Sequence, residues 1–353
     1  MKILLAPLNW GLGHASRCVP LVQRLLDEGH EVVLGGDGDS LTLLRKHFPK
    51  LRYVYLAPLQ LRYSAGQRQV WAMLRALPQL IRWSLQDHAM LRAVLREEYF
   101  DQVVSDNRFG LFINEARTGI TTNDQRPITV YMTHQLRVLL PCGWRWLEPL
   151  VARLHARIYT RYNKVWVPDR KGSGTEYPPR DTLAGELSHL HSTLNSQPST
   201  LIEYIGPLSR FSLALPTTND KSPTTNYDVV AVLSGLEPHR TMLEKELVSR
   251  YLGKEEKVLI VQGLMSKPLL RVTHKNITLV PYMNDAELAA ALLTAKHIIA
   301  RSGYSTIMDL VALGILTTKD KLLTTNDRTI ELIPTPGQPE QEYLAKWWNG
   351  ESC

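Results

Sequence analysis

Residues 2–17 read Lys-Ile-Leu-Leu-Ala-Pro-Leu-Asn-Trp-Gly-Leu-Gly-His-Ala-Ser-Arg. The aliphatic run at 2–7 predicts a buried strand, Gly11 and Gly13 predict a tight loop, and a helix is expected from His14 onward. A strand that enters a helix through a glycine loop begins a βαβ unit of a parallel sheet. The unpaired N–H groups at the start of such a helix suit an anion or a ligand rich in hydroxyl groups.

The same alternation of short aliphatic runs with longer helical patterns continues along the chain, which predicts an α/β fold. Strands are expected at 2–7, 31–34, 53–56, 102–105, 128–132 and 164–167, and again at 228–233, 258–261, 277–280, 297–300 and 330–333. Helices are expected at 14–28, 67–96 (interrupted near Pro78), 144–162, 284–295, 306–312 and 339–347.

A stretch rich in Pro, Thr and Asn around 214–226 separates the two series and has no hydrophobic periodicity. We therefore expect an N-terminal domain at 1–210, a linker at 211–227 and a C-terminal domain at 228–353. Each domain would be a Rossmann-like, doubly wound parallel sheet, and the two would face each other across a cleft.

Composition excludes several classes of protein. The chain has 353 residues, 44% hydrophobic and 21% charged, which fits a soluble protein of two domains and not a disordered chain. No apolar stretch approaches the roughly 20 residues that cross a bilayer. The three cysteines, Cys18, Cys142 and Cys353, are far apart and form no C-x-x-C, so we expect no disulfide framework or cysteine zinc site and a cytoplasmic location.

The net positive charge of the chain comes from its first half. Residues 1–210 hold 26 Lys and Arg against 18 Asp and Glu, a balance of +8, whereas residues 211–353 hold 15 against 16, a balance of −1. This asymmetry predicts an anionic partner for the first half. We see no nucleic-acid motif and expect no nucleic acid.

A basic, apolar segment at 50–96 adds to this expectation. Arg68, Arg75 and Arg82 recur every seven residues, beside an apolar series that includes Trp71 and Ile81. On a helix this is an amphipathic surface of the kind that docks on an anionic membrane, which would place the protein peripherally on the inner face of the membrane. A core helix with a solvated basic face is the alternative.

Candidate catalytic residues lie where strands of the first domain end. His14 follows the first glycine loop, where a neutral imidazole can take a proton from a hydroxyl near pH 7, although it can also be a capping or core histidine. Asp106 ends another strand and is a second candidate base. A dinucleotide fingerprint would need glycine where Ser16 stands, which disfavours an NAD-dependent oxidoreductase.

Loops of the second domain suit a phosphorylated sugar donor. After the strand at 297–300, a Ser/Gly loop leads to Ser305 or Thr306 as the expected helix cap, which is a diphosphate-binding arrangement. Asp309, one turn on, is placed for a ribose diol or is simply a first-turn acid. Side chains at 338–341 suit sugar hydroxyls, or form an ordinary acidic first turn, and Ser234-Gly235 repeats the strand-to-helix pattern more weakly.

Three motifs together resemble GT-B glycosyltransferases. They are Gly11-Leu-Gly13-His14, Arg301-Ser-Gly303-Tyr-Ser-Thr306-x-x-Asp309 and Pro334-x-Pro-Gly337-Gln338-x-Glu-Gln341. The chain is most similar to the group of the MurG-type peptidoglycan N-acetylglucosaminyltransferases and galactolipid synthases, glycosyltransferase family 28. Asp309 is one methylene shorter than the glutamate usual in that group.

The resemblance implies an inverting transfer from a nucleotide sugar, usually a UDP-sugar, to an acceptor hydroxyl, with no metal and no cofactor. His14 is the first candidate for the base and Asp106 the second, and the loop of Gly11 and Gly13 would lie on the acceptor side. The residues expected at the donor are Ser234, Gly235, Arg301, Ser302, Gly303, Ser305, Thr306, Asp309, Gln338 and Gln341. The acceptor is open, and only the basic segment favours a lipid-linked one.

Two other functions remain compatible with these residues. A UDP-sugar 2-epimerase of the same fold would isomerise the sugar without an acceptor. A non-catalytic nucleotide-sugar-binding protein would bind UDP tightly without turnover.

Overall fold

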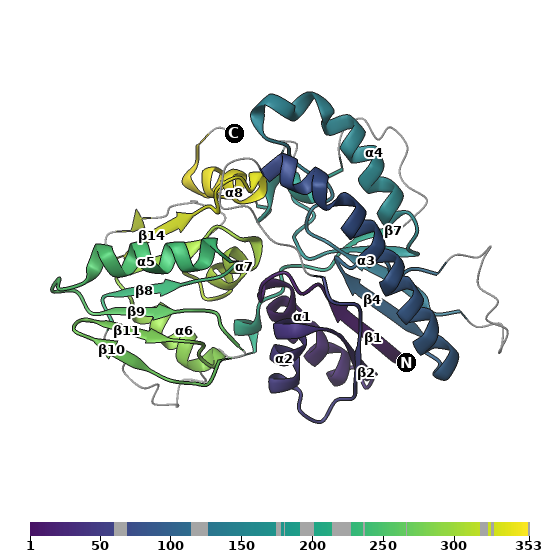
Figure 1. Ribbon diagram of the computed structural model, residues 1–353, viewed down its shortest axis with the longest axis horizontal. Coiled ribbons are helices and arrows are strands. Elements are labelled where there is room, and N and C mark those ends of the chain that lie inside the picture. Colours follow the sequence, from purple (N-terminus) through teal and green to yellow (C-terminus); the bar gives the residue numbers. More distant parts are fainter. Residues whose placement is uncertain are drawn as a thin grey trace.

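The computed structural model describes residues 1–59, 69–113, 126–173, 178–179, 181–190, 201–213, 227–235, 237–265, 267–317, 324–325 and 328–351. Most of the expected linker and Arg68 of the basic segment lie outside these ranges. The described residues form two α/β domains that lie side by side (Figure 1).

The first domain is built on a parallel sheet in the order β3-β2-β1-β4-β5-β6-β7. Its strands are β1 Lys2–Pro7, β2 Glu31–Gly36, β3 Tyr53–Tyr55, β4 Gln102–Asp106, β5 Ile128–Met132, β6 Lys164–Val167 and β7 Leu201–Tyr204. The order of the strands reverses direction between β1 and β4. In such sheets, ligands bind in the crevice outside the carboxyl ends of the strands at this switch point.

Helices cover both faces of this sheet, because alternate side chains of each strand point to opposite sides. Ile3 and Leu5 pack in one cluster with α1, whereas Leu4 and Ala6 pack in another with α3. The helical segments are α1 Gly13–Asp27, α2 Gly38–His47, α3 Gln69–Glu97, η1 Cys142–Leu147, α4 Glu148–Tyr159, η2 Gly185–Ser188 and η3 Arg210–Ser212.

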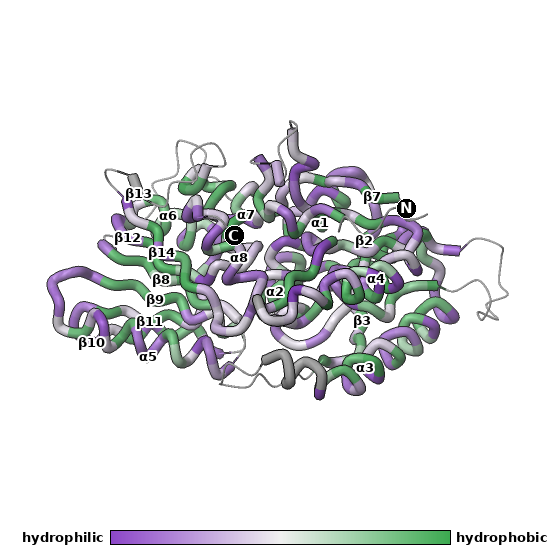
Figure 2. Tube along the Cα trace, turned by 90° about the horizontal axis from the view of Figure 1, so that it is seen from above, coloured by the Kyte–Doolittle hydropathy of each residue, from purple (hydrophilic) through white to green (hydrophobic). Residues whose placement is uncertain are grey.

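The second domain repeats the plan in the order β10-β11-β9-β8-β12-β14-β13, with a switch point between β8 and β12. The strands are β8 Val229–Val232, β9 Val258–Val261, β10 Val272–His274, β11 Ile277–Val280, β12 His297–Arg301, β13 Thr324–Thr325 and β14 Arg328–Ile333, of which β10 and β13 pair antiparallel at the two edges. The central strands are hydrophobic along most of their length (Figure 2). The helices are α5 His239–Tyr251, α6 Asp285–Thr294, α7 Tyr304–Ala312 and α8 Pro339–Asn349.

Several contacts join the domains, among them those of α1 and α8. Helix α1 packs directly against α7, and α8 returns to the first domain beside η2 (Figure 1). Trp348 of α8 is fully buried, and its Nε1 donates to the carbonyl of Leu183 at 3.2 Å. One hydrophobic cluster runs from α1 through Tyr304 to Trp348, so that the domains share part of a core.

Every strand expected from the sequence forms within two residues of its predicted bounds, and the first sheet ends at Tyr204 while the second begins at Val229. The sequence pattern did not predict α2, α5, β7 or the two edge strands β10 and β13. In place of the helix expected at 67–96 with an interruption near Pro78, the described residues form one helix, Gln69–Glu97, that continues through Pro78. None of the described helices is both long and apolar enough to cross a bilayer.

A buried charge cluster holds α3 against the first sheet. The guanidinium of Arg108 is fully buried and donates to both carboxylate oxygens of Asp87, at 2.7 and 2.9 Å, and to Asp37 at 2.9 Å. Burial raises the pKa of Asp87, and the hydrogen bonds and charge of Arg108 partly offset this rise. Asp87, which lies within the basic segment at 50–96, therefore anchors α3 to the first sheet.

Removing the partner of a buried charge is strongly destabilising. We expect Arg108→Met to lower the free energy of unfolding by about 3–5 kcal/mol, because Asp87 is left buried and unpaired. Urea unfolding measures this loss, and Arg96→Met, at the exposed end of α3, is the control and should change stability by less than about 0.5 kcal/mol. An equally small loss for Arg108→Met would contradict the role of the cluster.

Candidate active site

The glycine loops at the two switch points meet across the cleft. The loop after β1 holds Gly11, whose position for a Cβ lies 3.7 Å from the backbone of Gly235 in the loop after β8. At the next contact, Ser305 Oγ of α7 donates to the carbonyl of Gly13 at 2.9 Å. The acceptor-side and donor-side loops expected from the sequence therefore lie against each other.

His14 and Asp106, the two candidate bases, lie together at this contact. His14 Nδ1 is 3.0 Å from Asp106 Oδ1, and the imidazole is 16% exposed whereas the carboxylate is fully buried. The pair joins the first turn of α1, the helix that follows β1, to the end of β4. Strands β1 and β4 lie on either side of the switch point. Asp106 is thus placed to orient His14, and its burial keeps it from the cleft.

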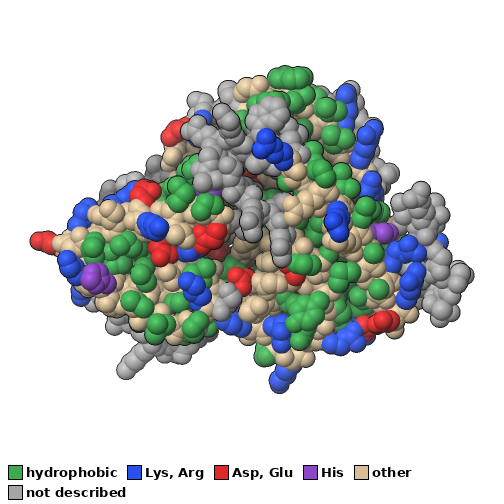
Figure 3. All heavy atoms as spheres, viewed as in Figure 1, with side chains coloured by type: hydrophobic (Ala, Val, Ile, Leu, Met, Phe, Trp, Pro, Cys, Tyr) green, Lys and Arg blue, Asp and Glu red, His purple; other side chains and the backbone are tan. Residues whose placement is uncertain are grey.

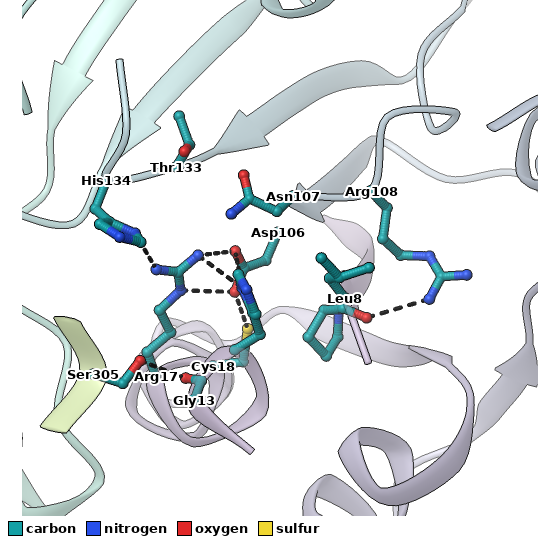
Figure 4. A network of polar contacts seen from close by, with 12 residues as sticks. Leu8, Gly13, Arg17, Cys18, Asp106, Asn107, Arg108, Thr133, His134 and Ser305 are labelled. Atoms are coloured by element: carbon teal, nitrogen blue, oxygen red, sulfur yellow. Dashed lines mark hydrogen bonds and ion pairs between the residues drawn. The ribbon is translucent and has the colours of Figure 1, made fainter. Parts of the chain in front are cut away.

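Arg17, which the sequence analysis did not single out, completes the pair. Its Nε donates to Asp106 Oδ2 at 2.8 Å, and its NH2 donates to Asp106 Oδ1. Its NH1 lies 2.9 Å from His134 Nδ1 (Figure 4). Because Arg17 is three residues after His14 on a helix, the two share one face, and this spacing is the signal that could have identified it.

The surrounding charges set the protonation of the pair. Burial alone would raise the pKa of Asp106, but Arg17 and His14 hold it well below its ordinary value, so the carboxylate is ionised. Burial lowers the pKa of His14 and Arg17 lowers it further, against the opposing effect of Asp106. His14 is therefore a neutral imidazole at neutral pH.

His134 was also missed, and it links the pair to the second domain. It follows β5, at the same carboxyl edge of the sheet as Asp106, and its Nε2 lies 2.6 Å from Glu340 Oε1 in the first turn of α8. The rule that strand ends gather at one edge could have identified it.

On the donor side, α7 begins at Tyr304, shortly after the end of β12 at the switch point. The residue before its first turn is Gly303, and no side chain caps the helix, so neither Ser305 nor Thr306 is the expected cap. A Cβ at Gly303 would meet open space. Thr306 is half-buried in the first turn. This helix start retains the features of an anion site.

Two expected donor residues have structural partners instead. Arg301 is buried and its guanidinium donates to the carbonyls of Pro334 and His239, at 3.0 and 2.8 Å, so it braces two loops. Ser302 is fully buried and donates through Oγ to the carbonyl of Gln341 at 2.8 Å. Both side chains thus bind backbone carbonyls of the protein, although the sequence predicted that they bind the donor.

Asp309 faces the segment that joins the domains. Its Oδ1 accepts a hydrogen bond from Ser209 Oγ at 2.6 Å, and its Oδ2 lies 3.8 Å from Nε of Arg210. Burial raises the pKa of Asp309 to about 6, although Arg210 and Ser209 act to lower it. One carboxylate oxygen is therefore engaged, and a contact with ribose stays a prediction.

The remaining candidates lie where α8 begins, after β14, and in the loop after β8. Gln341 Nε2 donates to Gln338 Oε1 at 2.7 Å, and Gln341 Oε1 accepts from the Thr335 N–H at 2.8 Å, which fixes the turn before α8. Ser234 is half-buried, and Gly235 has a φ of +95°, a conformation that favours glycine. No cluster of three or more metal-ligating side chains occurs among the residues that the structure describes.

Comparisons with known proteins agree with this architecture. No protein-family model matches the chain. A protein of Methanosarcina acetivorans named as an uncharacterized glycosyltransferase is 23% identical over 320 residues, covering 89% of this chain and 78% of the relative. The glycotransferase of kitacinnamycin superposes with a TM-score of 0.53 at 13% identity, covering 99% of this chain and 84% of that one.

Two further structures superpose almost as well. The spinosyn rhamnosyltransferase SpnG complexed with thymidine diphosphate has a TM-score of 0.51 at 15% identity, with 98% of this chain and 84% of that one covered. The protein has the GT-B fold. A putative UDP-N-acetylglucosamine 2-epimerase from Listeria monocytogenes also has a TM-score of 0.51, at 13% identity, with 98% of this chain and 86% of the other covered. The fold by itself therefore does not separate a glycosyltransferase from a 2-epimerase. None of these names identifies the family 28 group.

The raised pKa of Asp309 predicts that the stabilities of the wild type and of Asp309→Asn differ by an amount that depends on pH. The folded protein keeps the proton that the unfolded chain loses near pH 3.8, so wild-type stability falls as pH rises from about 4 to 6. The gap between 3.8 and about 6 corresponds to about 3 kcal/mol. Asp309→Asn keeps an acceptor for Ser209 and has no charge to bury.

We therefore expect Asp309→Asn to gain up to about 3 kcal/mol relative to the wild type between pH 4 and pH 7. Chemical unfolding of both proteins across this range measures the difference. Parallel pH curves for the two proteins would contradict the assigned burial of the carboxyl group.

Proposed function

We propose that this protein is a glycosyltransferase that moves a sugar from a nucleotide-sugar donor to an acceptor hydroxyl, with inversion at the anomeric carbon. The observation that carries this proposal is the contact of the two glycine loops, which brings His14 to the start of α7. The curated relatives named as glycosyltransferases and the GT-B fold support the same reaction.

The acceptor hydroxyl oxygen attacks the anomeric carbon while the bond from that carbon to the diphosphate breaks. His14 Nε2 takes the hydroxyl proton, and Asp106 holds Nδ1 and stabilises the imidazolium that forms. The nucleoside diphosphate leaves with the electron pair of the broken bond. Asp106 is thus a positioning residue in this mechanism, and the hypothesis that it is itself the base is set aside because it is buried and paired.

The leaving diphosphate is stabilised by the start of α7, with Gly303, Ser305 and Thr306 around it. The helix dipole and the open N–H groups favour a negative charge there without requiring a bound metal. Gly235, in the loop opposite, allows the backbone to approach the ligand. Gln338 and Gln341 form the turn that faces the donor sugar. Asp309 lies nearest the ribose. UDP is the proposed nucleotide.

Replacing His14 tests this assignment. His14→Asn keeps a donor to Asp106 and removes the base, so we expect kcat/KM to fall by about 10²- to 10⁴-fold while binding of UDP is retained. For the wild type, kcat/KM should rise with pH through a pKa below 6.5 and then stay level.

The assay screens UDP-, TDP- and GDP-sugars with sugar and lipid-linked acceptors, with and without EDTA. His274→Asn, at the exposed edge strand β10, is the control and should be as active as the wild type. Full activity of His14→Asn would remove His14 from the mechanism. Isomerisation of a UDP-sugar without an acceptor would establish the epimerase, and tight UDP binding with no turnover on any acceptor would establish a binding protein.

We also propose that the acceptor is lipid-linked and that the first domain docks on an anionic membrane. On α3 the side chains of Leu77, Ile81 and Leu85 are 48%, 60% and 65% exposed, which disagrees with a core helix at these positions. Trp146, Leu150 and Leu154 of η1 and α4 are exposed as well.

Arginines surround these apolar side chains. Arg75 and Arg82 are exposed on α3, and Arg145, Arg153 and Arg157 are exposed on η1 and α4. Figure 3 shows hydrophobic and basic side chains gathered over α3 and α4, with no acidic side chain between them among the described residues of this face. Apolar insertion combined with basic charge suits an anionic lipid surface.

Introducing negative charge on this surface tests the docking. We expect Ile81→Glu/Leu85→Glu to weaken binding to phosphatidylglycerol vesicles by about tenfold or more, measured by co-sedimentation. Leu269→Glu/Leu270→Glu, equally exposed on the second domain, is the matched control and should bind as the wild type does. Equal binding of all three proteins, or binding to neutral phosphatidylcholine only, would contradict the proposal.

A further inference from the structure

His134 connects three elements that are far apart in the sequence. Its Nδ1 lies 2.9 Å from Arg17 NH1 on α1, and its Nε2 lies 2.6 Å from Glu340 Oε1 on α8. Its ring stacks on that of Tyr304, the first residue of α7, with centroids 4.3 Å apart and planes 6° from parallel. His134 is 6% exposed. Two of its three partners belong to the donor-binding domain.

The donor and acceptor roles in this chain of bonds follow from the chemistry of its members. A guanidinium only donates, so Nδ1 of His134 accepts from Arg17 and carries no proton. A neutral imidazole then has its hydrogen on Nε2, where it donates to Glu340. Burial alone would raise the pKa of Glu340, but His134, with His14 and Arg17 beyond it, lowers it, so this carboxylate is ionised. The bonds run in one direction, from Arg17 through His134 to Glu340.

This chain fixes the plane of the Arg17 guanidinium. Nε and NH2 are held by Asp106, and NH1 is held by His134 (Figure 4). NH2 also lies 3.0 Å from His14 Nδ1, so Arg17 and His14 compete for the same oxygen, Asp106 Oδ1. With Arg17 held on both sides, NH2 is directed at the carboxylate.

The competition decides which tautomer His14 adopts. When Nδ1 of His14 carries the hydrogen, it donates to Asp106, and Nε2 has the lone pair that takes the acceptor proton. When Arg17 NH2, which lies 3.0 Å from His14 Nδ1, instead donates to that nitrogen, the hydrogen of His14 is on Nε2 and His14 is no longer a base. Once NH1 loses its partner, Asp106 alone holds the guanidinium, and NH2 can tilt toward His14 Nδ1.

We propose that His134 is a positioning residue that keeps His14 in the base-competent tautomer by holding Arg17 against Asp106. Because Glu340 and Tyr304 belong to the second domain, this arrangement depends on the contact between the two domains. The inference rests on the proposed role of His14 as the base. His134 itself touches no reacting atom in this account.

The test reads the tautomer directly, by ¹⁵N NMR of protein with labelled histidine, in which the His14 signals are assigned from their absence in His14→Asn. His134→Phe keeps the ring on Tyr304 and removes both nitrogens. We expect the proton of His14 to shift from Nδ1 toward Nε2 in this variant. We also expect kcat to fall by about 10- to 100-fold, with the KM for the donor changed less than about threefold.

A conservative variant should restore the arrangement. His134→Gln offers an amide oxygen to Arg17 and an amide N–H to Glu340, so it should recover the wild-type tautomer and most of kcat. Glu340→Ala removes the last acceptor of the chain from the other domain and should shift the tautomer in the same direction as His134→Phe. If His134→Phe does not fold, the tautomer of His14 in Glu340→Ala tests the proposal.

The control is another contact between the domains. Lys46 on α2 lies over the Tyr282 ring at 3.7 Å and donates to the carbonyl of Met265 at 3.4 Å, so Lys46→Gln loosens the interface without touching Arg17. It should leave the His14 tautomer unchanged. A wild-type tautomer in both His134→Phe and Glu340→Ala would overturn the proposal. A shifted tautomer in a protein that transfers no sugar would refute the proposed function and leave the positioning intact.

Discussion

The buried ion pair between Arg17 and Asp106 is the interaction on which the site depends. It joins the first helix to the end of β4, across the point where the order of strands in the first sheet reverses. A buried pair of this kind adds little net stability, since both charges lose their hydration. Its value is geometric, because the guanidinium fixes the carboxylate whose Oδ1 lies 3.0 Å from His14 Nδ1.

The second constraint is the symmetry of the two domains. Each sheet has one switch point, each switch point opens into a glycine loop, and α1 packs against α7 so that these loops touch. A donor bound at the start of α7 is therefore within reach of a base at the start of α1. Chemistry at this place needs no side chain from either sheet interior, which is filled with hydrophobic residues.

The sequence predicted most strands because buried parallel strands are short, continuous aliphatic runs between polar loops. It predicted the places of His14, Asp106 and Gly303 because loops at the carboxyl ends of strands gather at one edge. It missed α5, whose polar composition lacks a strong apolar face, and the edge strand β10, which is exposed.

Roles that depend on tertiary contacts were beyond the sequence. Arg301 and Ser302 look like ligands for a diphosphate in a linear motif, yet the fold turns both onto backbone carbonyls of neighbouring loops. Arg17 and His134 looked unremarkable because their partners are 89 and 206 residues away in the chain. Such long-range pairs leave no local periodicity to detect.

The proposed function requires that the start of α7 bind the diphosphate of the donor. Calorimetric titration with UDP of the wild type and of Gly303→Val tests it most directly. Gly303 has a φ of −72° that valine adopts without strain, and its Cβ would project into open space, so the variant should fold normally and fill the site. The account predicts that the wild type binds UDP and that Gly303→Val loses this binding. Equal UDP affinity of the two proteins would contradict it.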